Sequence, residues 1–350
     1  MIDLREYGVF PEHLPQGAAG EPARVTAVYR ERYELICAAG ERSGRLKTAA
    51  YYGGGELFPT VGDEVLIDGA AQEECRILRT LPRRTVFVRR EPGPVPREQA
   101  VAANFDEVLI LQSLNRDFNL HRLERYLAQA WQSGASPVVV LTKADLAAES
   151  AALLRAAEGA APGVPVHAVS VRTGEGLEAL AARLRPGRTF VLLGSSGVGK
   201  SSLVNALAGA ELMQTGEIRA EDGRGRHTTT HRQLLRLPGG ALVIDTSGMR
   251  ALGMWDAAEG LSETFADVEQ YLGRCRFSDC RHEREPGCVV RAALESGALP
   301  RERWESWCRL RGEAAYADDK AAYLRRRQQW HKEVAKRQRQ IEKSGGKDRF

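Results

Sequence analysis

The 350-residue sequence has no long hydrophobic run. None of its apolar segments approaches the roughly 18 consecutive residues that a membrane-spanning helix requires. The first ten residues, MIDLREYGVF, are charged and lack the basic and then apolar pattern of a secretion signal. Hydrophobic residues make up 43% and charged residues 27% of the chain, which is typical of a soluble globular protein. We therefore expect a cytoplasmic protein with no membrane partner.

The sequence also lacks internal repeats, and its length predicts two or three domains. Residues 22–90 contain short β-type segments separated by turns such as YYGGGE, which favours a small closed barrel. The segment REPGPVPREQ is a candidate linker. From about residue 101, apolar strands alternate with helices, which predicts a mostly parallel sheet with helices on both faces. The last part is helical, and we place the domains at residues 1–95, 96–257 and 258–350.

A glycine-rich segment follows the predicted strand TFVLL and opens the predicted helix KSSLVNALAG. It fits Gly-x4-Gly-Lys-Ser/Thr, a phosphate-binding loop in which backbone N–H groups and a helix N-terminus hold the anion. Lys200 is expected to reach the β- and γ-phosphates, and the Ser201 hydroxyl to bind Mg²⁺. The predicted nucleotide contacts here are Gly194, Ser195, Ser196, Gly197, Val198, Gly199, Lys200, Ser201 and Ser202.

A candidate base-reading loop, Thr142-Lys143-Ala144-Asp145, lies about fifty residues before the phosphate loop, the reverse of the usual GTPase order. The Asp145 carboxylate can accept hydrogen bonds from guanine N1–H and the 2-amino group, which adenine does not offer in that pattern. This residue favours a GTPase over an ATPase or kinase with the same phosphate loop. Lys143 is expected along the base. Ser170, in SVRTGEG, is expected near the guanine oxygen.

The first position of the base-reading loop lacks the common asparagine, whose amide bridges the base and the loop. Thr142 offers only a hydroxyl there. We expect a weaker hold on the nucleotide, with base discrimination left to Asp145.

An Asp-x-x-Gly turn, Asp245 to Gly248, closes the predicted strand ALVIDT. Asp245 can hold Mg²⁺, often through water, and the Gly248 N–H can bind a γ-phosphate. The threonine-rich loop GRGRHTTTHRQ precedes it, and a threonine hydroxyl can complete Mg²⁺ coordination when the γ-phosphate is present. Thr228 and Thr229 both remain candidates. The predicted magnesium ligands are Ser201, Thr229 and Asp245.

The sequence lacks the glutamine that positions the attacking water in many GTPases, and Met249 stands in its place. His227, beside the candidate magnesium threonine, is the best substitute for orienting water. The predicted catalytic residues are therefore His227, Lys200 and Thr229. Without such a group, the protein is instead an RNA-binding adaptor that binds the nucleotide with little catalysis.

Only six cysteines occur, and three of them, with one histidine, fall within fourteen residues. In a cytoplasmic chain, this clustering indicates a metal site rather than disulfides. Cys275, Cys280, His282 and Cys288 predict a closed, tetrahedral, structural zinc site. The alternative is a set of buried or incidental cysteines. We expect Cys37, Cys75 and Cys308 to be ordinary core or surface residues.

The net charge of +4 is concentrated at the C-terminus. Residues 325–350 contain ten Lys or Arg and three Asp or Glu, with Trp330 among them. Such a tail favours a phosphate-rich partner, although a solvated helix end is the simpler alternative. In the barrel, Arg24, Arg45 and Lys47 are candidate RNA phosphate contacts; the alternative is that the barrel is a spacer or a protein-docking module.

The motif order and the segments VAANFDEVLIL, GSSGVGKSSLVNAL, GRHTTTH and DTSGMR resemble the bacterial small-ribosomal-subunit-dependent, circularly permuted GTPases. The resemblance covers roughly residues 22–325 and departs at Thr142 and at Ser247, where the family usually has proline. It implies a multi-domain protein with an N-terminal OB-fold barrel, a central permuted α/β GTPase domain and a C-terminal, mainly α zinc domain.

The same resemblance implies how such a protein works. It implies a monomer that binds GTP or GDP, Mg²⁺ and one Zn²⁺, and contacts the small ribosomal subunit, its rRNA and other assembly factors. It implies GTP hydrolysis to GDP and phosphate late in subunit maturation, slow alone and stimulated by the subunit. It also gives His227 the water-orienting role.

Overall fold

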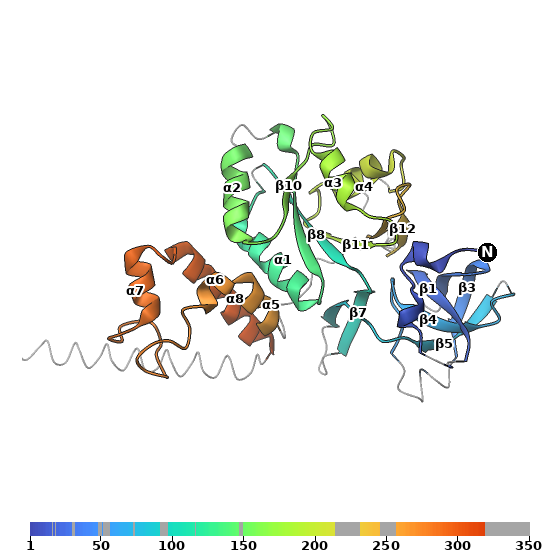
Figure 1. Ribbon diagram of the computed structural model, residues 1–350, viewed down its shortest axis with the longest axis horizontal. Coiled ribbons are helices and arrows are strands. Elements are labelled where there is room, and N and C mark those ends of the chain that lie inside the picture. Colours follow the sequence, from blue (N-terminus) through green and yellow to red (C-terminus); the bar gives the residue numbers. More distant parts are fainter. Residues whose placement is uncertain are drawn as a thin grey trace, which may run out of the picture. The chain divides into compact units, whose positions relative to one another are not determined.

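The computed structural model forms two compact units, residues 1–252 and 253–350 (Figure 1). It describes residues 1–318 apart from 16, 18, 30–31, 48–50, 52–56, 73, 92–96, 116, 147–149, 214–231 and 246–256. Within this part of the chain, no helix is both long and apolar enough to cross a membrane.

The first unit begins with two 3-10 turns, η1 (Leu4–Tyr7) and η2 (Pro11–His13), and a closed five-stranded barrel. The barrel strands are β1 (Glu21–Val28), β2 (Tyr33–Cys37), β3 (Gly40–Leu46), β4 (Glu64–Asp68) and β5 (Glu74–Thr80). They pair in the order β1-β2-β3-β5-β4, and β1 closes the ring by pairing with β4. Ala23, Val25, Leu35, Ile67 and Ile77 fill the interior. The predicted OB-type barrel is confirmed.

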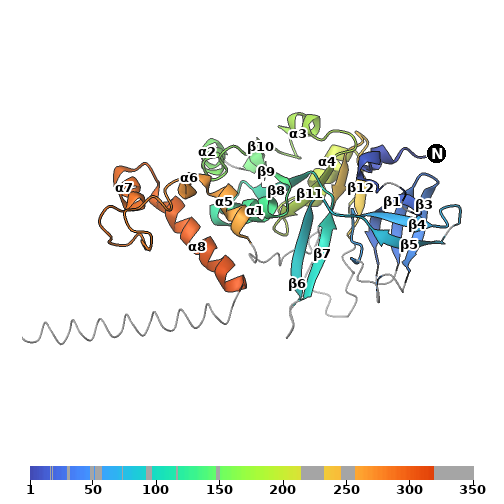
Figure 2. The same cartoon turned by 60° about the horizontal axis from the view of Figure 1, so that its bottom comes forward.

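Strands β6 (Val86–Glu91) and β7 (Arg97–Ala103) follow the barrel as an antiparallel hairpin (Figure 2). Glu91 lies opposite Arg97, so the chain is paired on both sides of residues 92–96. The proline-rich segment therefore connects two strands of one hairpin, and our prediction of a linker between domains was wrong there. Proline lacks the N–H needed within a ladder, which suits it to this connection.

A six-stranded sheet forms the rest of the first unit, in the order β10-β9-β8-β11-β13-β12. Its strands are β8 (Glu107–Ser113), β9 (Ser136–Thr142), β10 (Val166–Ala168), β11 (Thr189–Gly194), β12 (Leu234–Arg236) and β13 (Leu242–Ile244). All neighbours pair in parallel except β12 with β13. Parallel strands covered on both faces are apolar throughout, as in the run Val138 to Leu141.

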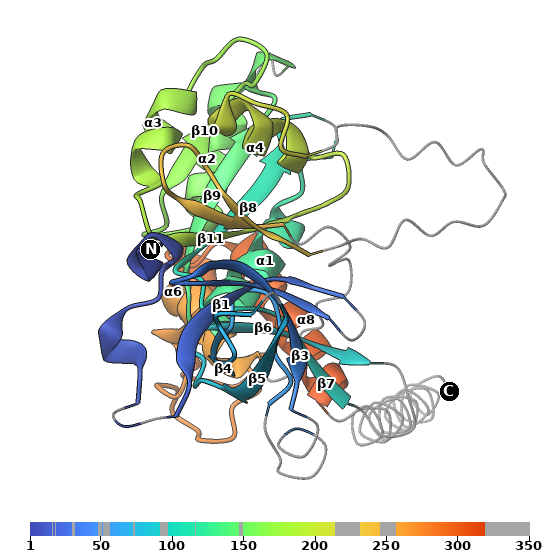
Figure 3. The same cartoon turned by 90° about the vertical axis from the view of Figure 1, so that its right-hand side faces the viewer.

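Helices cover both faces of this sheet (Figure 3). They are α1 (Leu120–Gln132), α2 (Ser150–Ala160), η4 (Ala144–Leu146), α3 (Leu177–Arg183) and α4 (Lys200–Ala208). Successive residues of β8 face opposite cores: Ile110 packs in the core that includes α1 and α2, and Leu109 in the core that includes α3 and α4. The predicted, mostly parallel sheet with two helical layers is confirmed.

Arg24 is fully buried in the first unit and joins three of its segments. Its guanidinium donates to the carbonyl oxygens of Tyr7 (2.6 Å), Gly62 (3.1 Å) and Asn104 (2.6 Å). Burial lowers the pKa of Arg24 to about 10. Our prediction that Arg24 contacts RNA phosphates was therefore wrong, because no part of it reaches the surface. Arg45 and Lys47 are exposed and keep that prediction open.

The second unit is mainly helical, as predicted, with α5 (Ala258–Thr264), α6 (Ala266–Glu269), α7 (Val289–Ser296) and α8 (Arg301–Asp318). The buried Arg303 ties α8 to the α5–α6 junction. It donates to the Asp267 carboxylate at 2.9 Å and lies over the Phe265 ring at 4.1 Å. The predicted boundaries at residues 95/96 and 257/258 stay predictions.

Candidate functional site

The phosphate loop connects the carboxyl end of β11 to the first turn of α4. Gly199 precedes the helix with φ of +103°, a conformation that other residues rarely adopt, and contributes no side-chain cap. Gly194 is equally constrained, because a Cβ there would lie 2.7 Å from the Leu111 carbonyl oxygen. The sequence therefore leaves the first N–H groups of α4 for an anion, as phosphate binding requires.

Lys200 folds back over this loop. Its Nζ lies 2.8 Å from the carbonyl oxygens of both Gly194 and Ser195. The ammonium group is thus held at the phosphate loop by the backbone, where it can attract the β- and γ-phosphates. Ser201 and Ser202 follow it on α4 and are half-buried.

The base-reading loop contacts the phosphate loop directly. The buried Thr142 hydroxyl donates to the Val198 carbonyl oxygen at 2.6 Å, and Lys143 Nζ donates to the Gly197 carbonyl oxygen at 2.9 Å. Lys143 has φ of +59°, which turns the chain out of β9 toward Asp145. The Thr142 hydroxyl and the Lys143 ammonium group therefore join the two loops.

Asp145 lies in η4, and both of its carboxylate oxygens have partners within the chain. Oδ1 accepts a 2.6 Å hydrogen bond from the hydroxyl of Ser170, which is fully buried. Oδ2 lies 3.2 Å from Arg172 Nε. The Ala144 N–H donates to the Val169 carbonyl oxygen and holds the two loops together. Ser170 thus orients the base-reading carboxylate, a role that the sequence analysis did not assign to it.

The structure describes only some of the predicted magnesium ligands. Asp245 follows β13, is buried, and donates its N–H to the Gln233 carbonyl oxygen at 3.1 Å. Strands β13 and β11 are parallel neighbours, so Asp245 and the phosphate loop leave the same edge of the sheet. A carboxylate and a serine hydroxyl are oxygen donors that suit Mg²⁺. The predicted His227, Thr228, Thr229 and Gly248 lie outside the described residues, as do Ser247 and Met249.

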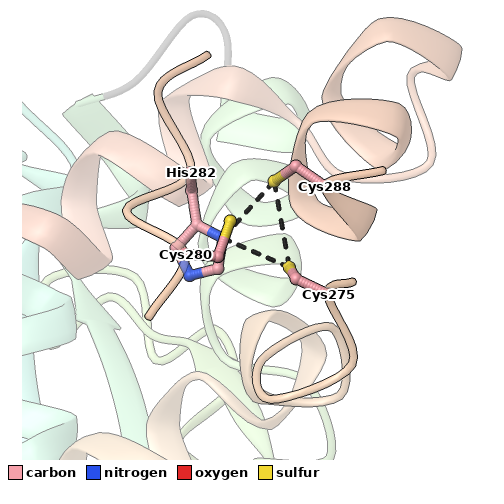
Figure 4. Close-up of side chains that lie close together, drawn as sticks. All are labelled: Cys275, Cys280, His282 and Cys288. Atoms are coloured by element: carbon pink, nitrogen blue, oxygen red, sulfur yellow. Dashed lines mark hydrogen bonds between the residues drawn. The ribbon is translucent and has the colours of Figure 1, made fainter. Parts of the chain in front are cut away.

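The four predicted zinc ligands come together in the second unit (Figure 4). Their ligand atoms all lie within 4.8 Å of one another. His282 Nδ1 lies 3.5, 3.6 and 3.4 Å from the sulfurs of Cys275, Cys280 and Cys288. Zinc–sulfur bonds of about 2.3 Å at tetrahedral angles place ligand atoms roughly 3.5 to 3.8 Å apart, so the donor set fits a closed zinc site.

The loop between His282 and Cys288 is held by Glu285. Its carboxylate accepts hydrogen bonds from the N–H groups of Arg281 (3.2 Å), Glu283 (2.9 Å) and Arg284 (3.0 Å). The backbone N–H of Glu285 itself, followed by those of Arg284, Arg281 and Glu283, lowers the pKa of this carboxyl group to about 2. On the other side, Trp304 meets the His282 ring edge-on, with ring centroids 5.5 Å apart. Glu285 is a positioning residue that the sequence spacing did not reveal.

Comparison with known proteins decides the family. The model of the RsgA GTPases matches residues 80–255. The small ribosomal subunit biogenesis GTPase RsgA 1 of Listeria monocytogenes is 47% identical over 89% of this chain and 90% of its own. The chain belongs to the RsgA GTPase family.

Other members and neighbours agree in sequence and fold. The small ribosomal subunit biogenesis GTPase RsgA of Streptomyces coelicolor is 47% identical over 83% of this chain and 79% of its own. The crystal structure of YjeQ from Thermotoga maritima aligns with a TM-score of 0.61 at 25% identity, covering 83% of this chain and 96% of that one. YloQ, described as a circularly permuted GTPase, aligns at 0.59 and 20% identity over 85% of this chain and 96% of its own, which shows the fold. The reversed motif order is thus that of a permuted GTPase fold.

Membership in the RsgA GTPases makes the protein a GTP hydrolase and favours that interpretation over the nucleotide-binding adaptor. Two residues at its nucleotide site were not found from the sequence. Arg172 pairs with Asp145, and Asp117 accepts a 3.1 Å hydrogen bond from the Ser195 hydroxyl of the phosphate loop. Asp117 follows β8, which is the parallel neighbour of β11. Its position after a predicted strand was the sequence signal that could have placed it near the phosphate loop.

Proposed function

We propose that this RsgA-family GTPase binds the small ribosomal subunit and hydrolyses GTP to GDP and phosphate during late maturation of that subunit. The observation that carries the nucleotide part is the direct contact between the base-reading loop and the phosphate loop, through Thr142 and Val198. The relatives named above, which are small ribosomal subunit biogenesis GTPases, support the ribosomal part. GTP favours binding to the subunit and hydrolysis favours release.

In this proposal, the base-reading loop binds the guanine and the phosphate loop binds the phosphates of GTP. Asp145, oriented by Ser170, accepts the guanine N1–H and 2-amino hydrogens, while Lys143 lies along the base. Lys200 moves from the loop carbonyls to the β- and γ-phosphates. Ser201 and Asp245 would hold Mg²⁺, with Thr228 or Thr229 completing the set; Mg²⁺ would neutralise charge on the β- and γ-phosphates.

Catalysis in this proposal does not use a glutamine after Asp-x-x-Gly. His227 orients the attacking water, and the Gly248 N–H binds the γ-phosphate. Because Met249 stands where many GTPases have the water-positioning glutamine, we expect turnover to be slow alone and faster when the ribosomal subunit orders the switch. Met249 cannot orient water by a strong hydrogen bond, so it does not replace His227.

The second unit supplies a rigid surface for the subunit. Cys275, Cys280, His282 and Cys288 would hold one structural Zn²⁺, which closes the loop between α6 and α7. The basic residues 325–350 add salt-dependent attraction to rRNA. We propose a cytoplasmic monomer that meets other assembly factors on the subunit.

Sedimentation with purified ribosomal subunits tests the partner. We expect the protein to pellet with small subunits, and not with large subunits, when a non-hydrolysable GTP analogue is present. GDP should leave most of it in the supernatant. A Lys200→Ala variant, which loses the phosphate contact, should not respond to the analogue. Equal pelleting with GDP and the analogue would contradict the proposed cycle, and no pelleting would contradict the partner.

A further inference from the structure

Arg172 forms an ion pair with Asp145, the carboxylate that is expected to read the base. Its Nε lies 3.2 Å from Asp145 Oδ2, while Oδ1 is engaged by Ser170. The Asp145 side chain is only 10% exposed, whereas that of Arg172 is 77% exposed. A base that binds Asp145 therefore meets a carboxylate oxygen with which Arg172 already pairs.

The chemistry of the two ligands is alike. Guanine presents N1–H and a 2-amino group on one carbon atom, and arginine presents Nε–H and Nη–H donors on one carbon atom. Both therefore offer a planar pair of N–H donors that fits a carboxylate. We propose that Arg172 mimics guanine at Asp145 and competes with the nucleotide for it, which weakens binding and speeds release.

The surrounding loop allows this exchange. Its backbone is closed by hydrogen bonds from the Ser170 N–H to the Glu175 carbonyl oxygen and from the Gly174 N–H to the Ser170 carbonyl oxygen, both 2.9 Å. These bonds keep the Arg172 backbone beside Asp145 whether or not its side chain is paired. The exposed side chain can turn away when guanine enters and return when it leaves.

Competition and recognition predict opposite effects of removing Arg172 on nucleotide affinity. If the arginine only stacked on a bound base, removing it would weaken binding; because it takes the place of the base, removing it strengthens binding. An exposed ion pair changes an equilibrium constant by up to roughly fivefold. The inference rests on the proposed guanine-nucleotide site and adds a residue that limits its affinity.

Binding of fluorescent N-methylanthraniloyl GDP to the full-length protein tests the inference. We expect Arg172→Ala to lower the Kd roughly two- to fivefold and to slow dissociation. Arg185→Ala, at an exposed arginine before β11, is the matched control and should leave the Kd unchanged. The ratio between wild type and Arg172→Ala should shrink toward one between about 0.1 M and 1 M salt, as the Debye length falls from about 10 Å to 3 Å.

A double-mutant cycle separates the competition from a general effect of charge. In Asp145→Asn, the amide offers an N–H donor that suits the 2-oxo group of xanthine, and Arg172 has no carboxylate to pair with. Removing Arg172 should then leave binding of xanthosine diphosphate unchanged. A higher Kd or no change for GDP in Arg172→Ala would overturn the inference alone. Wild-type protein that binds no guanine nucleotide would instead overturn the proposed function.

Discussion

The Thr142 hydroxyl donates to the carbonyl oxygen of Val198 across 2.6 Å and joins the predicted base-reading loop to the predicted phosphate loop. The two residues are 56 positions apart in sequence, and the chain order of their loops is the reverse of the usual one. Their strands, β9 and β11, nonetheless flank β8 in one parallel sheet, so the two loops leave the same edge. The nucleotide site depends on that edge and not on chain order.

Thr142→Val tests this contact, because valine keeps the shape and removes the hydroxyl. The buried Val198 carbonyl oxygen then loses its donor, at a cost of about 1 kcal/mol. We expect Kd for GDP and for GTP to rise by roughly fivefold together, with the preference for guanine over adenine unchanged. Thr142→Ser, which keeps the hydroxyl, should bind almost as wild type. A changed base preference in Thr142→Val would contradict this assignment.

Ser170→Ala tests whether Ser170 orients Asp145. The variant loses the 2.6 Å hydrogen bond to Oδ1 at a fully buried position. We expect roughly fivefold weaker GDP binding and little change in ADP binding, because only the guanine edge uses Asp145. The thermal midpoint of unfolding is measured alongside as the control for folding. Equal loss for both nucleotides would indicate a general disturbance of the loop.

Arg24→Ala should destabilise the first unit. The carbonyl oxygens of Tyr7, Gly62 and Asn104 each lose the hydrogen bond from Arg24, although Gly62 keeps one from Asn104 Nδ2; we expect the free energy of unfolding to fall by about 3 kcal/mol. The exposed Arg45, paired with Glu74 at 2.7 Å, is the control, and its alanine variant should change that free energy by less than about 0.5 kcal/mol. Urea unfolding measures both. RNA binding should instead respond to Arg45→Ala. Equal stability of the two variants would contradict the structural role of Arg24.

Glu285→Gln should loosen the zinc loop, because the amide nitrogen cannot accept the backbone N–H bonds that the carboxylate accepts. We expect roughly tenfold weaker zinc retention in competition with a chromophoric chelator. Glu283→Gln, an exposed neighbour, should behave as wild type. Retention of zinc by Glu285→Gln at the wild-type level would show that the cysteine and histidine ligands fix the loop without Glu285.

The same carboxylate predicts a pH dependence. The folded pKa of Glu285, about 2, lies below its ordinary value of 4.5, so its contribution to stability is present above pH 4.5. That contribution declines as the pH falls from 4.5 toward 2. We therefore expect the wild type and Glu285→Gln to lose the same fraction of their zinc between neutral pH and pH 4.5. A wild-type advantage that disappears near pH 6 would contradict this.

Much of the fold and site could be predicted because the signals are local. The glycine spacing before Lys200 favours a particular backbone, and the spacing of Cys275, Cys280, His282 and Cys288 predicts that they share one metal ion, so each motif indicates its own geometry. Strand and helix alternation likewise predicted the parallel sheet. The hydrogen bond between Thr142 and Val198 could not be predicted from these patterns, because it depends on which strands are neighbours in the sheet.

The wrong and missed predictions share a physical cause: the type of a residue does not determine which groups it contacts. An arginine in a β-strand suggests an exposed charge, yet three carbonyl groups converge on Arg24 and satisfy it inside the protein. The prolines between Glu91 and Arg97 suggested a linker, although the pairing of the flanking strands decides that they connect a hairpin. Arg172 looked like an ordinary polar loop residue because its pairing with Asp145 spans two loops.

The most direct test of the account is phosphate release from GTP and from ATP, each with and without purified small ribosomal subunits. The account predicts slow release from GTP alone, a large increase with the subunit, and no release from ATP under either condition. Asp145→Ala should lose the preference for GTP, and removal of His227 should abolish the stimulated rate. GTP hydrolysis that is the same with and without the subunit would contradict the central claim.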